Sequence, residues 1–223
     1  EIAPWQVWHA VEEAGSDPAI PQGAIEIFQK ELGWREFAHY LHFHFPMLEK
    51  ENFRTEFNQF PWDSNNPHLP DWQHGSTGYP LVDAAMRQLW HTGWMHNRMR
   101  MLVASFLVKD LMLDWRVGER WFWDTLVDAS PASNPFGWQW TAGCGADGAP
   151  FFRIFNPITQ SEKFDPEGIY IRRWIPELHS LDNREIHFPS LESRNRCGYP
   201  EPIVDHSFAR QNALEAYQLI KRG

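Results

Sequence analysis

The sequence predicts an all-α fold that forms one domain over residues 1–223. Two observations support this prediction. Apolar residues return every three or four positions in several segments, as they do on the buried face of a helix. The alternation typical of a strand never persists beyond a few residues, because Pro or Gly interrupts the β-branched stretches. A length of 223 residues with 43% hydrophobic content suits a single large core.

The expected helices follow from this periodicity and from the residues that start and stop it. They cover residues 25–45, 81–90, 98–113, 119–126 and 208–220. Pro46 ends the first helix, and Pro80 stands where a first helical turn tolerates a missing amide proton. The opening residues Glu1-Ile-Ala-Pro-Trp enter a helical pattern with nothing before it. This favours a chain that is cut from a longer one and lacks the start of its domain.

Two segments are predicted to be irregular. Residues 130–148 are rich in Gly, Pro, Ser and Asn, which indicates a long ordered loop. Residues 176–202 are polar, contain four prolines and show little periodicity. They are therefore expected to form a surface excursion rather than a second domain.

Several classes of protein are excluded. No run of 18 apolar residues and no basic segment followed by an apolar one occurs, so we expect a cytoplasmic protein without a membrane partner. Cys144 and Cys197 stand 53 residues apart outside any C-x-x-C arrangement, which predicts free thiols. His39, His42 and His44 lie close together, but acids are few nearby and no H-E-x-x-H occurs, so no metal site is expected.

The charge distribution is uneven. A net charge of -9 opposes non-specific binding to nucleic acid. Residues 93–109, however, contain Arg98, Arg100 and Lys109 and no acid, so a local face can attract a polyanion. Thirteen Trp exceed what core packing needs, which suggests stacking surfaces or electron transfer.

A first candidate site is the segment Glu31-Leu-Gly-Trp-Arg-Glu-Phe. On a helix, Glu31, Trp34 and Arg35 lie within one turn and share a face. Taken alone, this pattern is also typical of a Trp at the edge of a core that is flanked by solvated charges.

Longer motifs carry more information. They are Thr77-Gly-Tyr-Pro-Leu-Val-Asp-Ala-Ala-Met-Arg-Gln-Leu, Thr92-Gly-Trp-Met-His-Asn-Arg-Met-Arg-Met, Phe136-Gly-Trp-Gln-Trp and Phe152-Arg-Ile-Phe-Asn-Pro. Together they resemble the photolyase and cryptochrome family over almost the whole chain, most closely the C-terminal FAD-binding helical domain of class I cyclobutane pyrimidine dimer photolyases. The resemblance implies a lyase that repairs such dimers in DNA by light-driven electron transfer from reduced FAD. It also implies a monomer, and a chain without the N-terminal α/β antenna domain, so that the antenna chromophore stays unidentified.

The resemblance further implies a flavin site. Its matching positions are Phe28, Glu31, Arg35, Asn97, Arg100, Asp128, Ser130 and Asn134. Asp128 can pair with Arg100 while it addresses the flavin, although a purely structural salt bridge is the alternative. Asn134 matches the residue that faces flavin N5, where an Asp would indicate a plant-type cryptochrome. Ser130 stands where the family often has a second Asp, which should weaken that contact.

A second departure concerns the phosphates of the flavin. The family's Ser- and Thr-rich phosphate-binding segment precedes the position that matches Glu1. We therefore expect this chain to bind FAD weakly or not at all.

The resemblance also implies a site for an extruded dimer. Trp34, Met101 and Trp140 would wall it, while Glu31 and Asn97 would bond its polar edges; photolyases are themselves a known case of base flipping. The DNA contacts would come from these aromatic and polar positions together with Arg35, Arg98 and Gln160. Matching members that repair (6-4) photoproducts have His at the positions of Asn97 and Met101, and neither residue here transfers a proton at neutral pH. The cyclobutane dimer is therefore the expected substrate.

Three tryptophans match the family's electron-transfer chain, namely Trp138, Trp115 and Trp62. From the sequence alone they are equally well interpreted as packing residues. His42, Trp90, Trp94 and Trp174 are assigned only to the core. Two alternatives remain for the whole chain, a cryptochrome-type blue-light photoreceptor without repair activity and a helical scaffold without flavin.

Overall fold

The computed structural model describes residues 2–147 and 152–221 and contains helices but no strand within them, which confirms the all-α prediction. The α-helices are α1 Pro4–Ala14, α2 Gln22–His44, α3 Leu69–His74, α4 Pro80–Thr92, α5 Asn97–Ser105, α6 Trp115–Thr125, α7 Ser133–Ala142, α8 Pro157–Phe164, α9 Ile169–Trp174, α10 Leu191–Cys197 and α11 His206–Lys221. The segment η3, Phe106–Asp110, continues α5 as a π-helical turn, and short 3-10 turns form η1 Pro46–Glu49, η2 Thr55–Gln59, η4 Pro176–Leu178 and η5 Glu185–His187.

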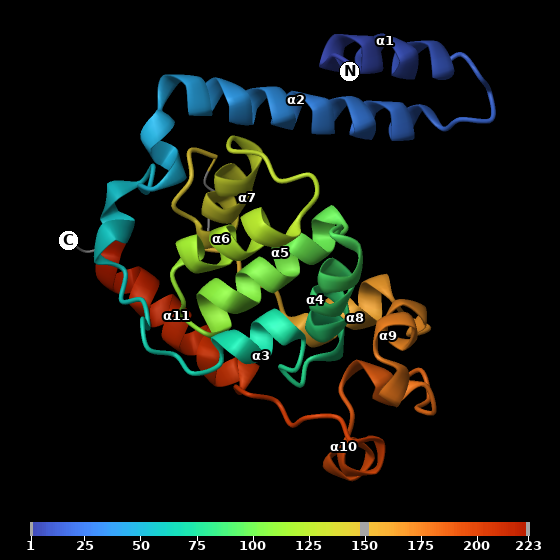
Figure 1. The fold of residues 1–223 in the computed structure, drawn as a ribbon, viewed down its shortest axis with the longest axis vertical. Helices are drawn as coiled ribbons and strands as arrows, with labels where there is room; N and C mark the ends of the chain where they lie inside the picture. Colours follow the sequence, from blue (N-terminus) through green and yellow to red (C-terminus); the bar gives the residue numbers. More distant parts are fainter. Residues whose placement is uncertain (1, 148–151, 222–223) are drawn as a thin grey trace.

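The helices form a body with a hairpin along one side of it. In Figure 1, α1 and α2 run side by side across the top, and α7, α6, α5 and α4 lie beneath them. The core is built around the second half of α5 and around η3, where every residue from 102 to 110 is buried. By contrast, α1 has no buried residue, and α2 approaches the body mainly through α7 and η1. The cavity described below is lined by residues of α2, α5, α6 and α7.

One glycine brings two site-bearing loops together. Gly93 ends α4 in the left-handed conformation, with φ 68°, which favours a residue without a Cβ. Its carbonyl accepts a hydrogen bond of 2.9 Å from the amide of Val127. The loop before α5 and the loop after α6 are thereby joined at the point where Asn97 and Asp128 enter the cavity lining.

The helix predictions hold, but the loop prediction for residues 130–148 is wrong. Helix α7 lies within this range, and Gly148 lies outside the described residues. Pro135 sits near the start of α7, where its missing amide proton costs little. Trp138 and Gln139 are buried, so packing stabilises a helix that its Gly and Asn content does not favour.

The prediction of a surface excursion at residues 176–202 is also wrong. This segment contains η4, η5 and α10, and Leu178, Ile186 and Tyr199 are buried in the core. Arg194 is buried with them and donates to backbone oxygens of Pro189, Gly78 and Pro200. Irregular backbone is stabilised here by a buried guanidinium, which periodicity does not reveal.

The assignment of four residues to the core fails in part. Trp90 is 68% exposed and Trp94 45% exposed, whereas His42 and Trp174 are half-buried. Trp90 instead stacks on Trp121 at the surface, with 5.8 Å between ring centroids and 8° between planes.

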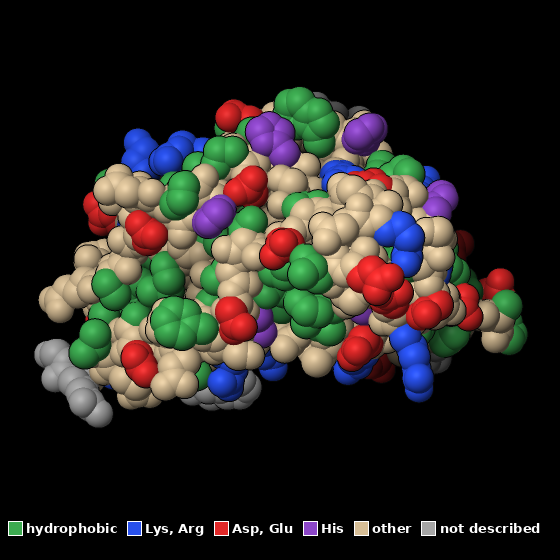
Figure 2. All heavy atoms as spheres, turned by 90° about the horizontal axis from the view of Figure 1, so that it is seen from below, with side chains coloured by type: hydrophobic (Ala, Val, Ile, Leu, Met, Phe, Trp, Pro, Cys, Tyr) green, Lys and Arg blue, Asp and Glu red, His purple; other side chains and the backbone are tan. Residues whose placement is uncertain are grey.

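Acidic side chains are scattered among apolar and polar ones on the face of the molecule that Figure 2 shows from below. Among residues 2–147 and 152–221, no helix is long and apolar enough to cross a membrane. No cluster of three His, Cys, Asp or Glu that could hold a metal ion occurs in that same part of the chain.

Candidate active site

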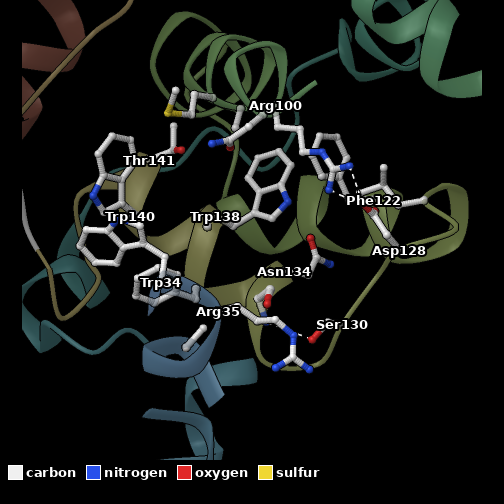
Figure 3. A pocket seen from close by; sticks show the side chains of 18 of the residues that line it. Trp34, Arg35, Arg100, Phe122, Asp128, Ser130, Asn134, Trp138, Trp140 and Thr141 are labelled. Atoms are coloured by element: carbon white, nitrogen blue, oxygen red, sulfur yellow. Dashed lines mark hydrogen bonds and ion pairs between the residues drawn. The ribbon is translucent and has the colours of Figure 1, made fainter. Parts of the chain in front are cut away.

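A cavity of about 440 Å³ opens between α2, α5 and the α6–α7 region. This volume is within the range of small-molecule sites. Eleven of the predicted site residues line it, as Figure 3 shows for most of them: Glu31, Trp34, Arg35, Asn97, Arg100, Met101, Asp128, Ser130, Asn134, Trp138 and Trp140. Residues that lie up to 109 positions apart in the sequence are thus gathered around one cavity.

A bidentate ion pair forms one side of the cavity. Arg100 Nη1 and Nη2 donate to Asp128 Oδ1 and Oδ2 over 3.1 and 2.8 Å. Arg100 Nε also donates to the carbonyl of Met95, over 2.7 Å, which fixes the guanidinium plane. Two parallel bonds of this kind orient the carboxylate as well as hold it. In Figure 3 the pair lies at the edge of the cavity, with Asn134 and Trp138 between it and Arg35.

The orientation of Asn134 is set by a residue that sequence reasoning missed. Its side-chain nitrogen donates to Glu119 Oε1 over 2.8 Å and to the Glu119 carbonyl over 3.0 Å. Both amide protons are therefore engaged, and the Oδ1 acceptor is left for a cavity ligand. Burial raises the pKa of Glu119, and the hydrogen bond from Asn134 opposes this rise. No sequence signal marks Glu119, which stands 15 positions before Asn134 in an ordinary helical pattern.

Ser130 has a local structural task in addition to its place in the lining. Its hydroxyl accepts from the amides of Ala132 and Ser133, each over 3.3 Å, at the start of α7. A serine therefore suits this turn in its own right.

Aromatic and apolar side chains form the opposite wall. Trp34 and Phe37 of α2 contact Phe136 of α7, with ring centroids 6.2 and 5.8 Å apart respectively. Trp140 and Met101 complete the wall, and Trp34 and Trp140 lie next to each other in Figure 3. Phe136 was not among the predicted site residues, although it belongs to the quoted motif Phe136-Gly-Trp-Gln-Trp.

The three predicted electron-transfer tryptophans differ in environment. Trp138 is buried at the cavity, and its indole N–H has no partner among the described residues. Trp115 is 0% exposed and donates to Asn52 Oδ1 over 2.8 Å. Trp62 is half-buried against Phe60, with ring centroids 4.4 Å apart. The three tryptophans therefore lie in different environments: Trp138 at the cavity, Trp115 fully buried and Trp62 partly exposed to solvent.

Five predicted residues lie outside the cavity lining. They are Phe28, Trp62, Arg98, Trp115 and Gln160. Phe28 is 49% exposed on α2 and does not line the cavity. Arg98 lies over the ring of Phe164, with its guanidinium carbon 3.8 Å from the centroid, and Gln160 is on the same helix α8 as Phe164. Both are half-buried, Arg98 on α5 and Gln160 on α8.

The residues present fit a flavin. An isoalloxazine ring has apolar faces and a polar edge, and the cavity joins Trp138, Phe122 and Leu126 to the charged and amide groups of Arg100, Asp128 and Asn134. The arrangement also leaves an aromatic wall at Trp34 and Trp140 for a second planar group.

Comparison with known proteins agrees with this geometry. The sequence profile described as the FAD binding domain of DNA photolyase matches residues 28–219. The deoxyribodipyrimidine photo-lyases of Agrobacterium fabrum and Escherichia coli are 52% and 48% identical to the chain, over 100% of it and 48% of their own length. The chain therefore spans about half the length of the curated relatives it matches.

Solved structures show the same fold. A bacterial class III photolyase from Agrobacterium tumefaciens superposes with a TM-score of 0.92 at 51% identity, over 100% of this chain and 48% of that one. A cryptochrome from Synechocystis superposes with a TM-score of 0.88 at 35% identity, over 96% of this chain and 46% of that one. Because one of these structures is a class III enzyme, the expectation of class I stays a prediction.

Proposed function

This chain belongs to the DNA photolyase family, and from that premise we propose that the protein containing it repairs cyclobutane pyrimidine dimers in DNA with light and reduced FAD. One observation carries the proposal. A flavin-type polar set, Arg100, Asp128 and Asn134, and a base-stacking wall, Trp34 and Trp140, line a single cavity. When bound, the flavin supplies the light absorption and the electron.

The chain's own residues supply binding and geometry. The Arg100–Asp128 pair and the Asn134 oxygen hold and orient the flavin edge, while Trp138 packs beside it. Trp34, Trp140 and Met101 take the extruded dimer by stacking and apolar contact. Glu31 and Asn97, on facing helices, bond its polar edge.

The choice of substrate rests on α5. Asn97 and Met101 are four positions apart on this helix and both line the cavity, so they meet the same ligand. Neither an amide nor a thioether transfers a proton at neutral pH. Splitting a cyclobutane ring needs an electron out and back and no acid, which these two residues permit.

DNA binding is assigned to the rim of the cavity. Arg98, Arg35 and Gln160 are the groups proposed to contact phosphate and sugar beside the extruded base. The guanidinium of half-buried Arg98 lies over the ring of Phe164, on the helix that also carries Gln160. We propose Trp138, Trp115 and Trp62 as the route that returns oxidised flavin to its reduced form.

The test is blue-light repair of a thymine dimer in a short oligonucleotide by flavin-loaded protein. Glu31→Ala and Asn97→Ala are expected to lower repair roughly 5- to 150-fold, because each removes a hydrogen bond worth about 1–3 kcal/mol. Glu26→Ala, an exposed acid on the same helix outside the cavity, is the matched control and should repair like the wild type. No repair by flavin-loaded wild type would reject the proposal and favour a cryptochrome-type photoreceptor.

A further inference from the structure

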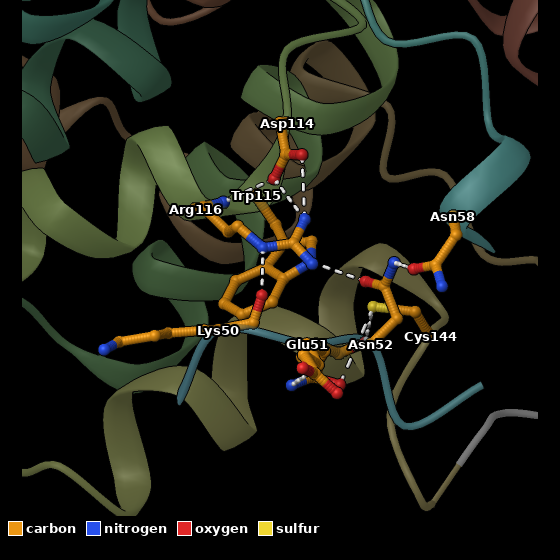
Figure 4. A network of polar contacts seen from close by, with 9 residues as sticks. Lys50, Glu51, Asn52, Asn58, Asp114, Trp115, Arg116 and Cys144 are labelled. Carbon is orange, nitrogen blue, oxygen red and sulfur yellow. Dashed lines mark hydrogen bonds and ion pairs between the residues drawn. The ribbon is translucent and has the colours of Figure 1, made fainter. Parts of the chain in front are cut away.

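The middle tryptophan of the proposed relay has a specific hydrogen-bond acceptor. Trp115 Nε1 donates to Asn52 Oδ1 over 2.8 Å, and Asn52 is itself only 5% exposed. Asn52 Nδ2 in turn donates to Asn58 Oδ1 over 2.8 Å, which fixes the amide with its oxygen toward the indole, as Figure 4 shows. The indole proton of Trp115 thus meets a neutral amide rather than water or a base.

The two charged side chains next to Trp115 in the sequence, those of Asp114 and Arg116, are paired with each other, whereas the indole N–H donates to Asn52. The Arg116 guanidinium lies over the indole ring, 4.7 Å from its centroid. Both oxygens of the Asp114 carboxylate accept from Arg116 Nη1, over 3.1 and 2.8 Å. In Figure 4 this ion pair lies on one side of the indole and Asn52 on the other.

The backbone around Asn52 is fastened on both sides. Gln139 of α7 donates to the carbonyls of Leu48 and Glu51 over 2.7 and 3.0 Å and accepts from the amide of Phe53 over 3.0 Å. Arg116 Nε donates to the carbonyl of Lys50 over 2.5 Å. These hydrogen bonds hold residues 48–53 in place as a cover over Trp115. They thereby position the amide of Asn52 beside the indole.

We propose that Asn52 is a positioning residue that keeps the indole proton on Trp115 while this tryptophan passes on an electron. The inference rests on the proposed function, in which the three tryptophans return oxidised flavin to its reduced form; when bound, oxidised flavin excited by light would supply the one-electron oxidant. One electron leaves Trp115 for oxidised Trp138, the N–H bond of Trp115 stays intact, and an electron from Trp62 refills the vacancy. An amide oxygen is too weak a base to take the proton at neutral pH.

If Trp115 keeps its proton, electron transfer can continue past this buried residue to Trp62. Loss of the proton from oxidised Trp115 would leave a neutral radical. This radical is a weaker oxidant than the protonated one, so it takes an electron from Trp62 less readily. Half-buried Trp62 lies closer to water, so the proton is released there. The direction of transfer thus depends on where a proton acceptor is available.

The first test needs no flavin. Exchange of the Trp115 indole N–H with solvent is measured by NMR, with the resonance assigned through Trp115→Phe. We expect it to exchange slower than that of exposed Trp90 by roughly 100-fold or more, because exchange requires opening of the cover. Equal rates would show that the bond to Asn52 does not shield the proton and would overturn the inference.

The second test follows the radical after a blue flash in the flavin-loaded full-length protein that contains this chain. It uses a Trp62→Phe background, in which the oxidised site remains on Trp115. Transient absorption distinguishes a protonated from a deprotonated indole radical. With Asn52 the protonated form should persist. In Asn52→Asp it should decay roughly 100-fold faster or more, the usual contribution of a positioned base. Asn52→Ala, which removes the acceptor and leaves room for water beside the indole, should also shorten the lifetime of the protonated form. An unchanged lifetime in Asn52→Ala would overturn the role of Asn52.

Each outcome bears on one proposal. The same rapid deprotonation with Asn52 and with Asp at this position would overturn the role of Asn52 and leave the relay intact. Absence of any indole radical in flavin-loaded wild type would reject the relay itself, whatever the NMR exchange shows.

Discussion

Gly118 of α6 packs directly against the indole of Trp138 in α7. A Cβ on Gly118 would lie 2.1 Å from Trp138 Cη2 and 2.5 Å from Leu107 Cδ2, which is too close for non-bonded carbon atoms. The missing side chain of Gly118 is therefore what allows α6 and α7 to approach and Trp138 to line the cavity.

Gly118→Ala is accordingly predicted to lower the free energy of unfolding by about 1–3 kcal/mol and to displace Trp138, because the added methyl group overpacks the core. Urea unfolding measures the first effect. Gly33→Ala on α2 is the matched control, since no atom lies within 4 Å of its added Cβ. That variant should be as stable as the wild type or more stable by up to about 1 kcal/mol. Equal stability of the two variants would contradict the packing.

The pair of Glu119 and Asn134 predicts a pH effect. Burial raises the pKa of Glu119 in the folded protein above its ordinary value of 4.5. The folded state therefore binds this proton more tightly than the unfolded state, and the stabilisation is lost as pH rises from about 4.5 through the folded pKa. Glu119→Gln keeps an acceptor for Asn134 but cannot ionise.

The measurement compares the two proteins in urea at a series of pH values. The wild type should lose stability relative to Glu119→Gln across this window and run parallel to it at lower pH. A constant difference over the whole series would show that the carboxyl does not titrate differently in the folded chain.

Asp128→Asn tests whether the bidentate pair serves the flavin or the fold. The carboxylate side chain is 47% exposed, so its ion pair should contribute less than about 1 kcal/mol to stability. A charge-assisted bond to a cavity ligand is stronger, and FAD affinity should fall roughly tenfold or more. Titration with FAD and urea unfolding separate the two, with exposed Asp124→Asn as control. A large loss of stability with unchanged FAD affinity would make the pair structural.

Sequence reasoning located the helices that periodicity marks, since α2, α4 and α11 match their predicted ranges closely. It missed α7 because the signals there are Gly, Pro and Asn, which indicate a loop unless burial of Trp138 is known. The prediction that Trp90 lies in the core was wrong, because its ring stacks on Trp121 at the surface instead.

The site was predicted through resemblance rather than through local pattern. Residues such as Trp34 and Arg100 come from recognisable motifs and do line the cavity. Glu119 and Asn52 could not be found, because each acts through hydrogen bonds to a site residue that lies 15 or more positions away in the sequence. Such partners depend on tertiary contact, which a single sequence does not display.

Lys109 supplies the last prediction, because it is a cation almost wholly enclosed by the core. It is 1% exposed, donates to the carbonyl of Thr141 over 2.7 Å and to that of Arg153, and lies 4.2 Å from the ring centroid of Phe152. Burial lowers the pKa of Lys109 from 10.5 to about 7, and the neighbouring Asp110 opposes this change. Between these two pH values the unfolded chain holds a proton that the folded chain has released.

The free energy of unfolding should therefore rise with pH from about 7 to 10.5 through this one group, because the unfolded state binds more protons there. Lys109→Met fills similar space without a titratable group, so it should lack this rise. The wild type is expected to gain on Lys109→Met steadily over that window in urea unfolding, whatever constant difference the lost hydrogen bonds create. Two curves that stay parallel from pH 7 to 10.5 would mean that the Lys109 ammonium keeps its proton in the core, satisfied by the two carbonyls alone.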